Sequence, residues 1–254
     1  MKTIFAIMPC YNEQENIGAL IDAWLSQQEA LLKRGCLLQI IAIDDSSTDR
    51  TGAIVREKAR EFTNVSLVSH GENRGLCGGV NTAIRYFLTN GKPGDLMVLM
   101  DGDNTQEPRY ILPMLEELAQ GYDCVIASRY QPDSGVVGLS RGRTFLSDMA
   151  RLYYRFMLRV PRVQDYTCGY RVYRFEIMQK LTERYGEEPV QEKTFACMME
   201  LLFKLHLAGA GFSETGFTLR YDNKGGESKM RVLSTMKNSL VVALKLSRKR
   251  ENRP

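Results

Sequence analysis

The chain has 254 residues, of which 44% are hydrophobic, and its formal net charge is +4. This length and apolar share suit one α/β domain or two small ones with a sizeable core, and the mild charge matters less than its distribution. The six cysteines form no CxxC pair and have no zinc-site spacing with the two histidines, which argues against a zinc site and indicates unpaired thiols in a reducing compartment.

Basic side chains gather at the end of the chain. The last ten residues carry them at positions 245, 248, 249, 250 and 253, against a single acidic residue, Glu251. Such a tail is either a solvated end or a segment attracted to anionic surfaces. It contains no aromatic residue of the kind that stacks on bases, so we expect no nucleic-acid partner.

The start of the chain resembles a signal peptide only superficially. Acidic residues at positions 13 and 15 cut its apolar stretch short, and no small-residue cleavage site follows. No uncharged apolar run approaches the roughly 20 residues that cross a bilayer. We therefore expect a cytoplasmic protein, or one attached peripherally to the cytoplasmic face of a membrane.

Short apolar runs alternate with stretches of helical spacing through the first half of the chain. The runs predict strands over residues 4–8, 37–43, 65–68, 96–100 and 122–127, and the spacing predicts helices over 16–32, 51–62 and 79–88. This alternation predicts right-handed crossovers and a mostly parallel sheet flanked by helices, an α/β fold. Each of these strands ends in polar residues, several of them acidic.

The second half is less regular. We expect a functional loop over residues 131–142, an amphipathic helix over 143–160, a strand over 165–173, a helix over 192–207, a strand over 212–221 and a last basic helix over 230–246. The helix over 143–160 either covers the protein's own core or lies on a membrane surface with its arginines toward anionic headgroups. We divide the chain into one α/β domain, residues 1–229, and a basic amphipathic helix with its tail, residues 230–254, a candidate for membrane association.

Two carboxylates, Asp101 and Asp103, follow the fourth apolar run. In open α/β sheets, ligands bind just outside the carboxyl ends of the strands. Two carboxylates in a dry cleft repel each other unless a cation lies between them, and hard oxygen ligands suit Mg²⁺ or Mn²⁺ bridged to phosphates. The alternative is a solvated acidic turn. A calcium-binding loop fits worse, because Gln106 stands where that loop requires glycine.

Eight motifs in order resemble the inverting glycosyltransferases of family 2, closest to the dolichyl- or polyprenyl-phosphate sugar synthases, and they cover most of the chain. They are Pro-Cys-Tyr-Asn-Glu (9–13), Asp-Asp-Ser-Ser-Thr-Asp (44–49), Asn-Arg-Gly (73–75), Asp-Gly-Asp (101–103), Ser-Arg-Tyr (128–130), Arg143 with Ser147, Asp-Tyr-Thr-Cys-Gly-Tyr-Arg (165–171) and Gly-Glu-Ser-Lys (226–229). The resemblance implies a GT-A fold, an α/β sheet of this kind, and a nucleotide-sugar donor such as a UDP- or GDP-hexose.

The resemblance also assigns roles to residues. The donor-binding positions of the family match Pro9, Tyr11, Asn12, Glu13, Asp45, Asp101, Gly102 and Lys229. Asp101 and Asp103 match its metal ligands for Mg²⁺ or Mn²⁺, and Thr105 and Gln106 compete for a third place, for which we choose Gln106. Arg129, Arg143 and Ser147 match the positions that receive the acceptor phosphate. One departure is Asn223, which stands where mannose synthases of this kind often carry arginine, with Lys224 beside it.

The implied reaction is a single displacement with inversion, and we assign catalytic roles to Asp103, Arg129, Arg143 and Asp165. A polyprenyl-phosphate acceptor is already ionised, so it needs no base and the arginines serve as clamps. A hydroxyl acceptor needs a base, for which Asp165 is the candidate; the alternative for Asp165 is that it caps the turn at residues 167–169. A third possibility, from another class, is a catalytically inactive protein that binds nucleotide sugars.

Overall fold

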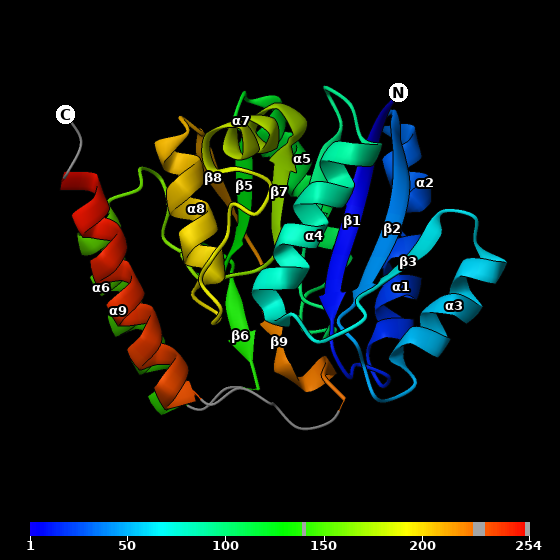
Figure 1. The fold of residues 1–254 in the computed structure, drawn as a ribbon, viewed down its shortest axis with the longest axis horizontal. Coiled ribbons are helices and arrows are strands. Elements are labelled where there is room, and N and C mark those ends of the chain that lie inside the picture. The colour runs from blue at the N-terminus through cyan, green and yellow to red at the C-terminus, as the bar shows by residue number, and fades with distance from the viewer. Residues whose placement is uncertain (139–140, 226–231, 252–254) are drawn as a thin grey trace.

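The structure is a computed structural model that describes residues 1–138, 141–225 and 232–251. Its strands are β1 (Lys2–Cys10), β2 (Cys36–Asp44), β3 (Val65–Ser69), β4 (Leu96–Leu99), β5 (Cys124–Ser128), β6 (Gly135–Val137), β7 (Arg171–Arg174), β8 (Phe212–Gly216) and β9 (Thr218–Arg220). Seven of them form a central sheet in the order β3-β2-β1-β4-β7-β5-β8 (Figure 1). Neighbouring strands are parallel except at β7, which is antiparallel to both β4 and β5. β6 and β9 form a separate parallel pair.

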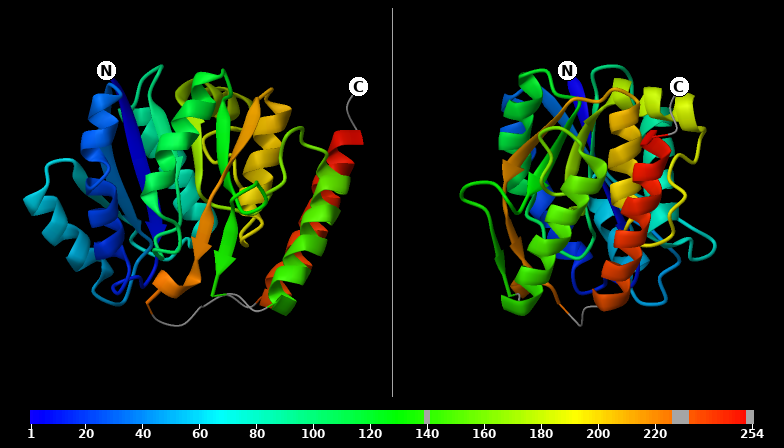
Figure 2. Two further views of the ribbon diagram at one scale, coloured as in Figure 1. Left: turned by 180° about the vertical axis from the view of Figure 1, so that it is seen from behind. Right: turned by 90° about the vertical axis from the view of Figure 1, so that its left-hand side faces the viewer.

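Helices cover both faces of this sheet. They are α1 (Ile17–Leu25), α2 (Gln28–Lys33), α3 (Thr51–Glu61), α4 (Gly75–Asn90), α5 (Ile111–Ala119), α6 (Arg141–Leu158), α7 (Phe175–Tyr185), α8 (Cys197–Leu207) and α9 (Val232–Glu251), with short 3-10 turns η1 (Pro108–Tyr110) and η2 (Tyr221–Asn223). In Figure 1, α4, α7 and α8 lie in front of the sheet, and Figure 2 shows α1, α2 and α5 on the opposite face. α6 and α9 stand beside the sheet, beyond β8.

The apolar runs form the central strands because both sides of these strands are covered. In β1, residues 4–8 are all buried, and β4 is buried along its whole length. A strand with helices on both faces needs apolar side chains on both sides, so its sequence is a continuous apolar run without alternation. The prediction of a mostly parallel sheet flanked by helices is therefore confirmed.

Helix boundaries in the first half differ from expectation where side chains bond to the main chain. The helix expected over 16–32 divides into α1 and α2, and Ser26 at the break donates its hydroxyl to the carbonyl of Ala23. α4 begins at Gly75, four residues earlier than expected, because the carboxylate of Asp45 accepts the N–H groups of Arg74 and Gly75 at its start. α5, which we did not predict, nevertheless has buried residues at helical spacing, positions 111, 114, 115 and 118.

The second half departs further from expectation. Of the strand expected over 165–173, only the last part forms a strand, as the beginning of β7. The residues before it form a loop, in which the N–H of Cys168 donates to the carboxylate of Asp165. The strand expected over 212–221 is two strands, separated at the fully buried Phe217, and its second half pairs with β6, inside the expected loop 131–142. α7 was not predicted, and the helix expected over 192–207 begins only at Cys197.

α6 and α9 pack against each other and run in the same direction (Figures 1 and 2). The hydroxyls of Tyr154 and Ser239 lie 2.6 Å apart, and further along the pair the hydroxyl of Ser247 lies 3.8 Å from the sulfur of Met157. Later residues of α6 therefore meet later residues of α9, which makes the pair parallel. The basic helix expected over 230–246 is α9, and its attachment to α6 does not test the proposed boundary at residue 229.

The outer surface of this helix pair is apolar. Leu152 and Phe156 on α6 are 51% and 64% exposed, and Met149 and Val241 are also exposed. The opposite side of α6 is buried, at Tyr154 for example, so α6 both covers the protein's core and presents an apolar stripe to the surroundings. Within the described ranges, no helix combines the length and the apolar character that crossing a bilayer requires.

Candidate active site

The candidate site forms where three neighbouring parallel strands end. β2, β1 and β4 lie next to one another in the sheet and run in the same direction. Their carboxyl ends therefore meet at one edge, which brings together the loops that follow Cys10, Asp44 and Leu99. These loops carry most of the residues that the sequence assigns to the donor.

The first two loops are bonded to each other. Asn12 has a left-handed backbone, with φ of +55°, and its side-chain oxygen accepts the N–H of Thr48 at 2.8 Å. In return, the N–H of Asn12 donates to the hydroxyl of Ser47 at 2.9 Å, and the N–H of Glu13 donates to the hydroxyl of Thr51 at 2.7 Å. The loop of the Pro-Cys-Tyr-Asn-Glu motif is thus held on the loop of the Asp-Asp motif. Two other residues of the Pro-Cys-Tyr-Asn-Glu motif differ in exposure. Pro9 is half-buried near the end of β1, and Tyr11 is exposed.

Asp45 lies between the second loop and the start of α4. It is 4% exposed, and its Oδ1 accepts from the N–H of Arg74 at 2.8 Å while its Oδ2 accepts from the N–H of Gly75 at 2.8 Å. Nδ1 of His70 lies 2.6 Å from Oδ1, and because a carboxylate only accepts, this nitrogen is the donor. His70 Nε2 lies 2.9 Å from the hydroxyl of Thr82. Sequence reasoning gave His70 no role, and its place directly after β3 was the available signal.

Two glycines make room around Asp101. A Cβ on Gly102 would lie 2.8 Å from the Cβ of Cys10, and a Cβ on Gly169 would lie 2.9 Å from Oδ1 of Asp101. Both separations are shorter than van der Waals contact allows. The Asp-Gly-Asp motif therefore packs against β1 on one side, and the loop that contains Gly169 packs against its first carboxylate on the other.

Gln106 and Thr105, the two candidates for a third ligand, each support a different carboxylate. Gln106 Nε2 donates to Asp101 Oδ2 at 2.8 Å, and the N–H of Asp101 donates to Gln106 Oε1 at 3.2 Å. The hydroxyl of Thr105 donates to Asp103 Oδ1 at 2.7 Å. Burial, followed by the charge of Asp103, raises the pKa of Asp101 to about 7. The choice of Gln106 as a metal ligand remains a prediction.

A lysine from the far end of the chain completes this corner. Nζ of Lys224 donates to Oδ2 of Asp103 at 2.7 Å, across 121 residues of sequence. The ammonium already binds a carboxylate that the sequence assigns to a cation. The carboxylates of Asp101 and Asp103 are hard oxygen donors, which fit Mg²⁺ or Mn²⁺, and the loop of Gly169 lies close against the first of them.

Arg129 and Asp165 form the second charged centre, at the carboxyl end of β5. Arg129 Nε donates to Asp165 Oδ2 at 2.8 Å and Nη2 donates to Oδ1 at 2.7 Å, a bidentate pair. Asp165 is fully buried and also accepts the N–H of Cys168 at 3.0 Å, so it caps the turn as well. Burial alone would raise the pKa of Asp165, but the charge and hydrogen bonds of Arg129 outweigh it and lower the pKa below its usual value.

Ser147 lies close to this centre. Its hydroxyl is 2.8 Å from the hydroxyl of Tyr130, the residue after Arg129, and the guanidinium of Arg151 lies 4.4 Å from the centre of the Tyr130 ring. Arg143 stands one turn before Ser147 in α6, and its side chain lies outside the described part of the structure. Lys229 lies outside the described residues altogether. Of the predicted acceptor residues, the structure therefore brings Ser147 close to Arg129, through the contact of Ser147 with Tyr130.

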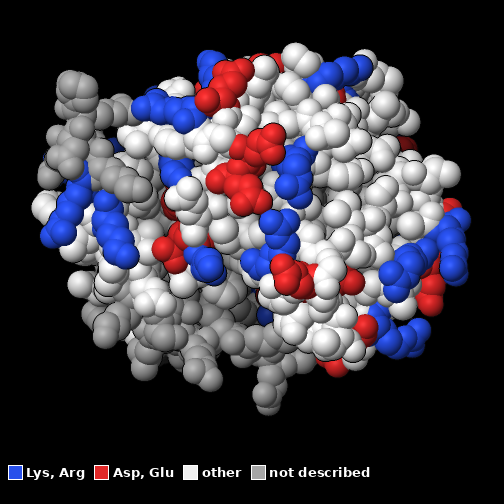
Figure 3. All heavy atoms as spheres, in the orientation of Figure 1, with Lys and Arg blue, Asp and Glu red and all other residues white. Residues whose placement is uncertain are grey.

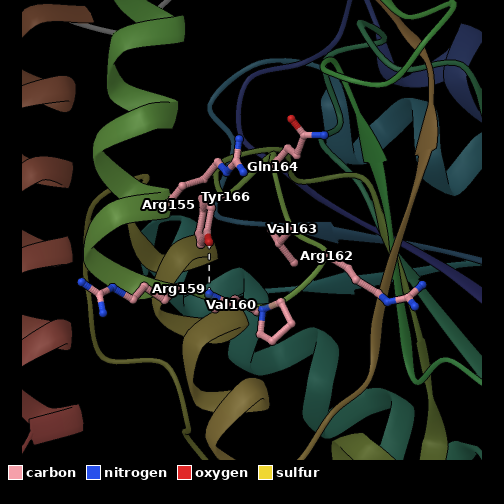
Figure 4. Close-up of a pocket in the computed structure, with 8 residues that line it drawn as sticks. Arg155, Arg159, Val160, Arg162, Val163, Gln164 and Tyr166 are labelled. Carbon is pink, nitrogen blue, oxygen red and sulfur yellow. Dashed lines mark hydrogen bonds between the residues drawn. The ribbon is translucent and has the colours of Figure 1, made fainter.

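A cavity of about 350 Å³ lies between the end of α6 and the segment that follows it, and Gln164 and Tyr166, the neighbours of Asp165, are part of its lining (Figure 4). Its lining includes Arg155, Arg159 and Arg162, yet the side chains of Arg159 and Arg162 point to opposite sides, so these two guanidinium groups do not converge on one ligand. Figure 3 shows basic and acidic side chains interspersed over the face seen in Figure 1.

Comparison with known sequences places the chain among glycosyltransferases. The family model for glycosyl transferase family 2 matches residues 5–182. The chain is 29% identical over 231 residues to an undecaprenyl-phosphate mannosyltransferase from Micrococcus luteus, which covers 89% of this chain and 87% of that protein. It is 29% identical over 226 residues to a polyprenol monophosphomannose synthase from Mycolicibacterium smegmatis, covering 88% and 79%.

Solved structures share the fold at lower identity. Glucosyl-3-phosphoglycerate synthase from Mycobacterium tuberculosis, in complex with Mn²⁺, UDP and its product, superposes with a TM-score of 0.66 at 16% identity, covering 97% of this chain and 80% of that one. A mannosyltransferase from Pyrobaculum calidifontis in complex with GDP-mannose and Mn²⁺ gives a TM-score of 0.62 at 17% identity, covering 98% and 65%.

Proposed function

This chain belongs to glycosyl transferase family 2, and we propose that it transfers a hexose, with inversion, from a UDP- or GDP-sugar to the phosphate of a polyprenyl lipid. Sequence relatives whose names state such acceptors support the proposal. The observation that carries it is the state of Asp165. The candidate base for a hydroxyl acceptor is fully buried, bonded through both oxygens to Arg129, and has a lowered pKa. A phosphate acceptor needs no base, because it is already an anion at neutral pH.

We propose that the donor binds at the two bonded loops that follow β1 and β2. The loop of Tyr11, Asn12 and Glu13 and the nearby Asp45 would hold the nucleoside, with their positions fixed by the bonds between the two loops. Asp101 and Asp103 would hold Mg²⁺ or Mn²⁺, which neutralises the charge that builds up on the departing nucleoside diphosphate. Mn²⁺ is present in structural neighbours with bound UDP or GDP-mannose.

The acceptor side would use Arg129, Ser147 and Arg143. The bond to Asp165 fixes the guanidinium plane of Arg129 through Nε and Nη2, and no hydrogen bond among the described residues uses Nη1. A fixed guanidinium orients a phosphate without losing much side-chain freedom on binding. Asp165 would thus act as a positioning residue for Arg129.

Peripheral attachment to a membrane is part of the proposal. The apolar stripe of α6 and α9 stands beside exposed basic residues, which are Arg155 on α6, Arg159 just after the end of α6, and Lys245 on α9. Apolar and basic side chains on one surface are the features of helices that bind anionic membrane surfaces. The six cysteines are unpaired and buried, in keeping with a reducing cytoplasm as the place where the donor is available.

The experiment is a product assay with matched acceptors. The protein is incubated with Mn²⁺, a panel of UDP- and GDP-hexoses and either a polyprenyl phosphate or the corresponding free polyprenol, and products are identified by mass spectrometry. We expect a hexosyl phosphate lipid and free nucleoside diphosphate from the first acceptor alone. Transfer to the free alcohol at an equal or higher rate would replace the phosphate acceptor with a hydroxyl acceptor, and no transfer with any donor would support an inactive binding protein.

A further inference from the structure

Lys224 directly follows η2 and reaches into the acidic pair from the opposite end of the sequence. Its Nζ lies 2.7 Å from Oδ2 of Asp103, and the two side chains are only 15% and 20% exposed. The ammonium is therefore paired with the second carboxylate of the acidic pair in a largely buried position.

The backbone beside Lys224 is fixed to the first donor loop. The N–H of Gly225 donates to Oδ1 of Asn16 at 2.8 Å, and Nδ2 of Asn16 donates back to the carbonyl of Gly225 at 3.2 Å and to Oε2 of Glu13 at 2.7 Å. A Cβ on Gly225 would lie 2.9 Å from the side chain of Glu15, so the approach is close. These contacts hold the ammonium within reach of the acidic pair.

Asp103 cannot keep this contact and also receive a divalent ion at the same oxygen. Its Oδ1 accepts the hydroxyl of Thr105 at 2.7 Å, and its Oδ2 accepts the ammonium. A dication and an ammonium on one carboxylate oxygen repel each other over a few ångströms in a site with little water. Binding of metal at Oδ2 of Asp103 therefore requires that Lys224 move to another anion.

We propose that Lys224 takes the place of the metal on Asp103 in the free protein and moves to the diphosphate of the donor when metal binds, which couples metal binding to donor binding. The inference rests on the proposed function, in which donor and metal share this corner. A nucleoside diphosphate supplies the anion that the displaced ammonium needs, and lysine binds phosphate as a point charge without strict geometry. Coupling of this kind is reciprocal, so each ligand strengthens the other.

The test measures metal and nucleotide binding separately. Mn²⁺ binding is followed by electron paramagnetic resonance without nucleotide, and UDP or GDP binding by calorimetry with saturating Mn²⁺, for the wild type and Lys224→Gln. We expect the variant to bind Mn²⁺ alone about tenfold more tightly, because the competitor is gone, and to bind nucleoside diphosphate about tenfold more weakly. The opposite signs separate this role from a structural one, which would weaken both.

Lys58→Gln is the matched control. Lys58 on α3 is also a partly buried lysine in an ion pair, with Asp22 on α1, and its removal subtracts the same charge. It should change neither affinity. Lys224→Arg provides a second variant that keeps the cation, and it should retain the weak binding of Mn²⁺ alone, whether or not Lys224→Gln folds.

Two results are informative against the proposal in different ways. If Lys224→Gln binds Mn²⁺ alone as the wild type does, or more weakly, or if Lys224→Arg binds it more tightly than the wild type does, the inference is overturned while the metal site stands. If the wild type binds no Mn²⁺ either with or without UDP or GDP, the metal-dependent donor site of the proposed function fails, and the inference fails with it.

Discussion

The donor region and the α6–α9 pair are stabilised in different ways. Around the ends of β1, β2 and β4, polar side chains bond to the main chain of loops far away in sequence, as Asn12 does with Thr48 and Asn16 with Gly225. α6 and α9 meet mainly through buried apolar faces and leave a second apolar surface uncovered. A phosphate-rich, water-soluble ligand needs fixed polar groups, whereas a lipid chain needs only apolar surface, so the contrast matches two substrates of different chemistry.

Removal of either proposed metal-binding carboxylate in the donor region should have the largest effect on transfer. We expect Asp101→Asn and Asp103→Asn each to slow transfer by about 10³-fold or more, because the departing diphosphate loses its counter-cation. EDTA should have the same effect on the wild type. Release of nucleoside diphosphate measures the rate, and Asp22→Asn, a half-exposed carboxylate on α1, should leave it unchanged. Full activity in EDTA would contradict the metal site.

The pair of Arg129 and Asp165 joins the donor region to the helix pair and should give the next largest effect. Asp165→Asn should slow transfer by about 10²-fold and destabilise the fold by about 3 kcal/mol, because it leaves Arg129 largely buried without its counter-charge.

A pH profile separates this positioning role from general-base catalysis. Since the pKa of Asp165 is below its usual value of 3.8, the carboxylate stays ionised at every pH of a practical assay. Transfer rates from pH 5.5 to 8.5 should therefore fall by the same factor throughout in Asp165→Asn. A limb of the profile that disappears in the variant would identify Asp165 as a base. Arg129→Lys, which keeps the charge and loses the bidentate geometry, should be impaired without the same loss of stability.

Two glycines test how tightly each region is packed. Gly102→Ala places a methyl group 2.8 Å from the Cβ of Cys10, and we expect it to destabilise the protein by about 1–3 kcal/mol in urea denaturation. Gly142 lies exposed in the first turn of α6 with nothing within 4 Å of an added Cβ, so Gly142→Ala should instead stabilise by about 0.5 kcal/mol. Equal changes in the free energy of unfolding for the two variants would contradict a difference in packing between the two regions.

The exposed stripe should give the smallest effect, and only on membrane binding. Leu152→Ser and Phe156→Ser should each weaken sedimentation with anionic vesicles by about tenfold or less, since each removes part of a buried apolar contact. Thermal stability should be nearly unchanged because both side chains are more than half exposed. Leu32→Ser on α2 removes an equally exposed leucine and should not affect vesicle binding. If the wild-type protein does not sediment with anionic vesicles at low salt, the stripe has no role in membrane binding.

The sequence predicts what depends on neighbours within a few residues. The mostly parallel sheet and the positions of its first strands along the chain follow from continuous apolar runs such as the one in β1, and the acidic pair is visible because Asp101 and Asp103 are two positions apart. The family and its fold could also be recognised from the ordered motifs. The donor, metal and acceptor roles of individual residues remain predictions.

Contacts between distant segments could not be predicted in this way. The bond from Lys224 to Asp103 spans 121 residues, and no periodicity or local motif relates the two. The partner of Asp165 is Arg129, 36 residues earlier, and the sequence left Asp165 open between a base and a turn cap. His70 lacks a motif of its own, and its position next to Asp45 results from the pairing of β2 with β3.

The reversed direction of β7 sets the distance between the two charged centres of the candidate site. Because β7 runs against its neighbours, the segment that enters it, from Asp165 to Gly169, lies at the edge where β4 and β5 end. One end of that segment holds Arg129 and the other touches Asp101. Four residue steps span at most about 14 Å. This stretch of backbone therefore limits how far Arg129 can lie from Asp101, and so, in the proposed reaction, how far the acceptor phosphate can lie from the donor.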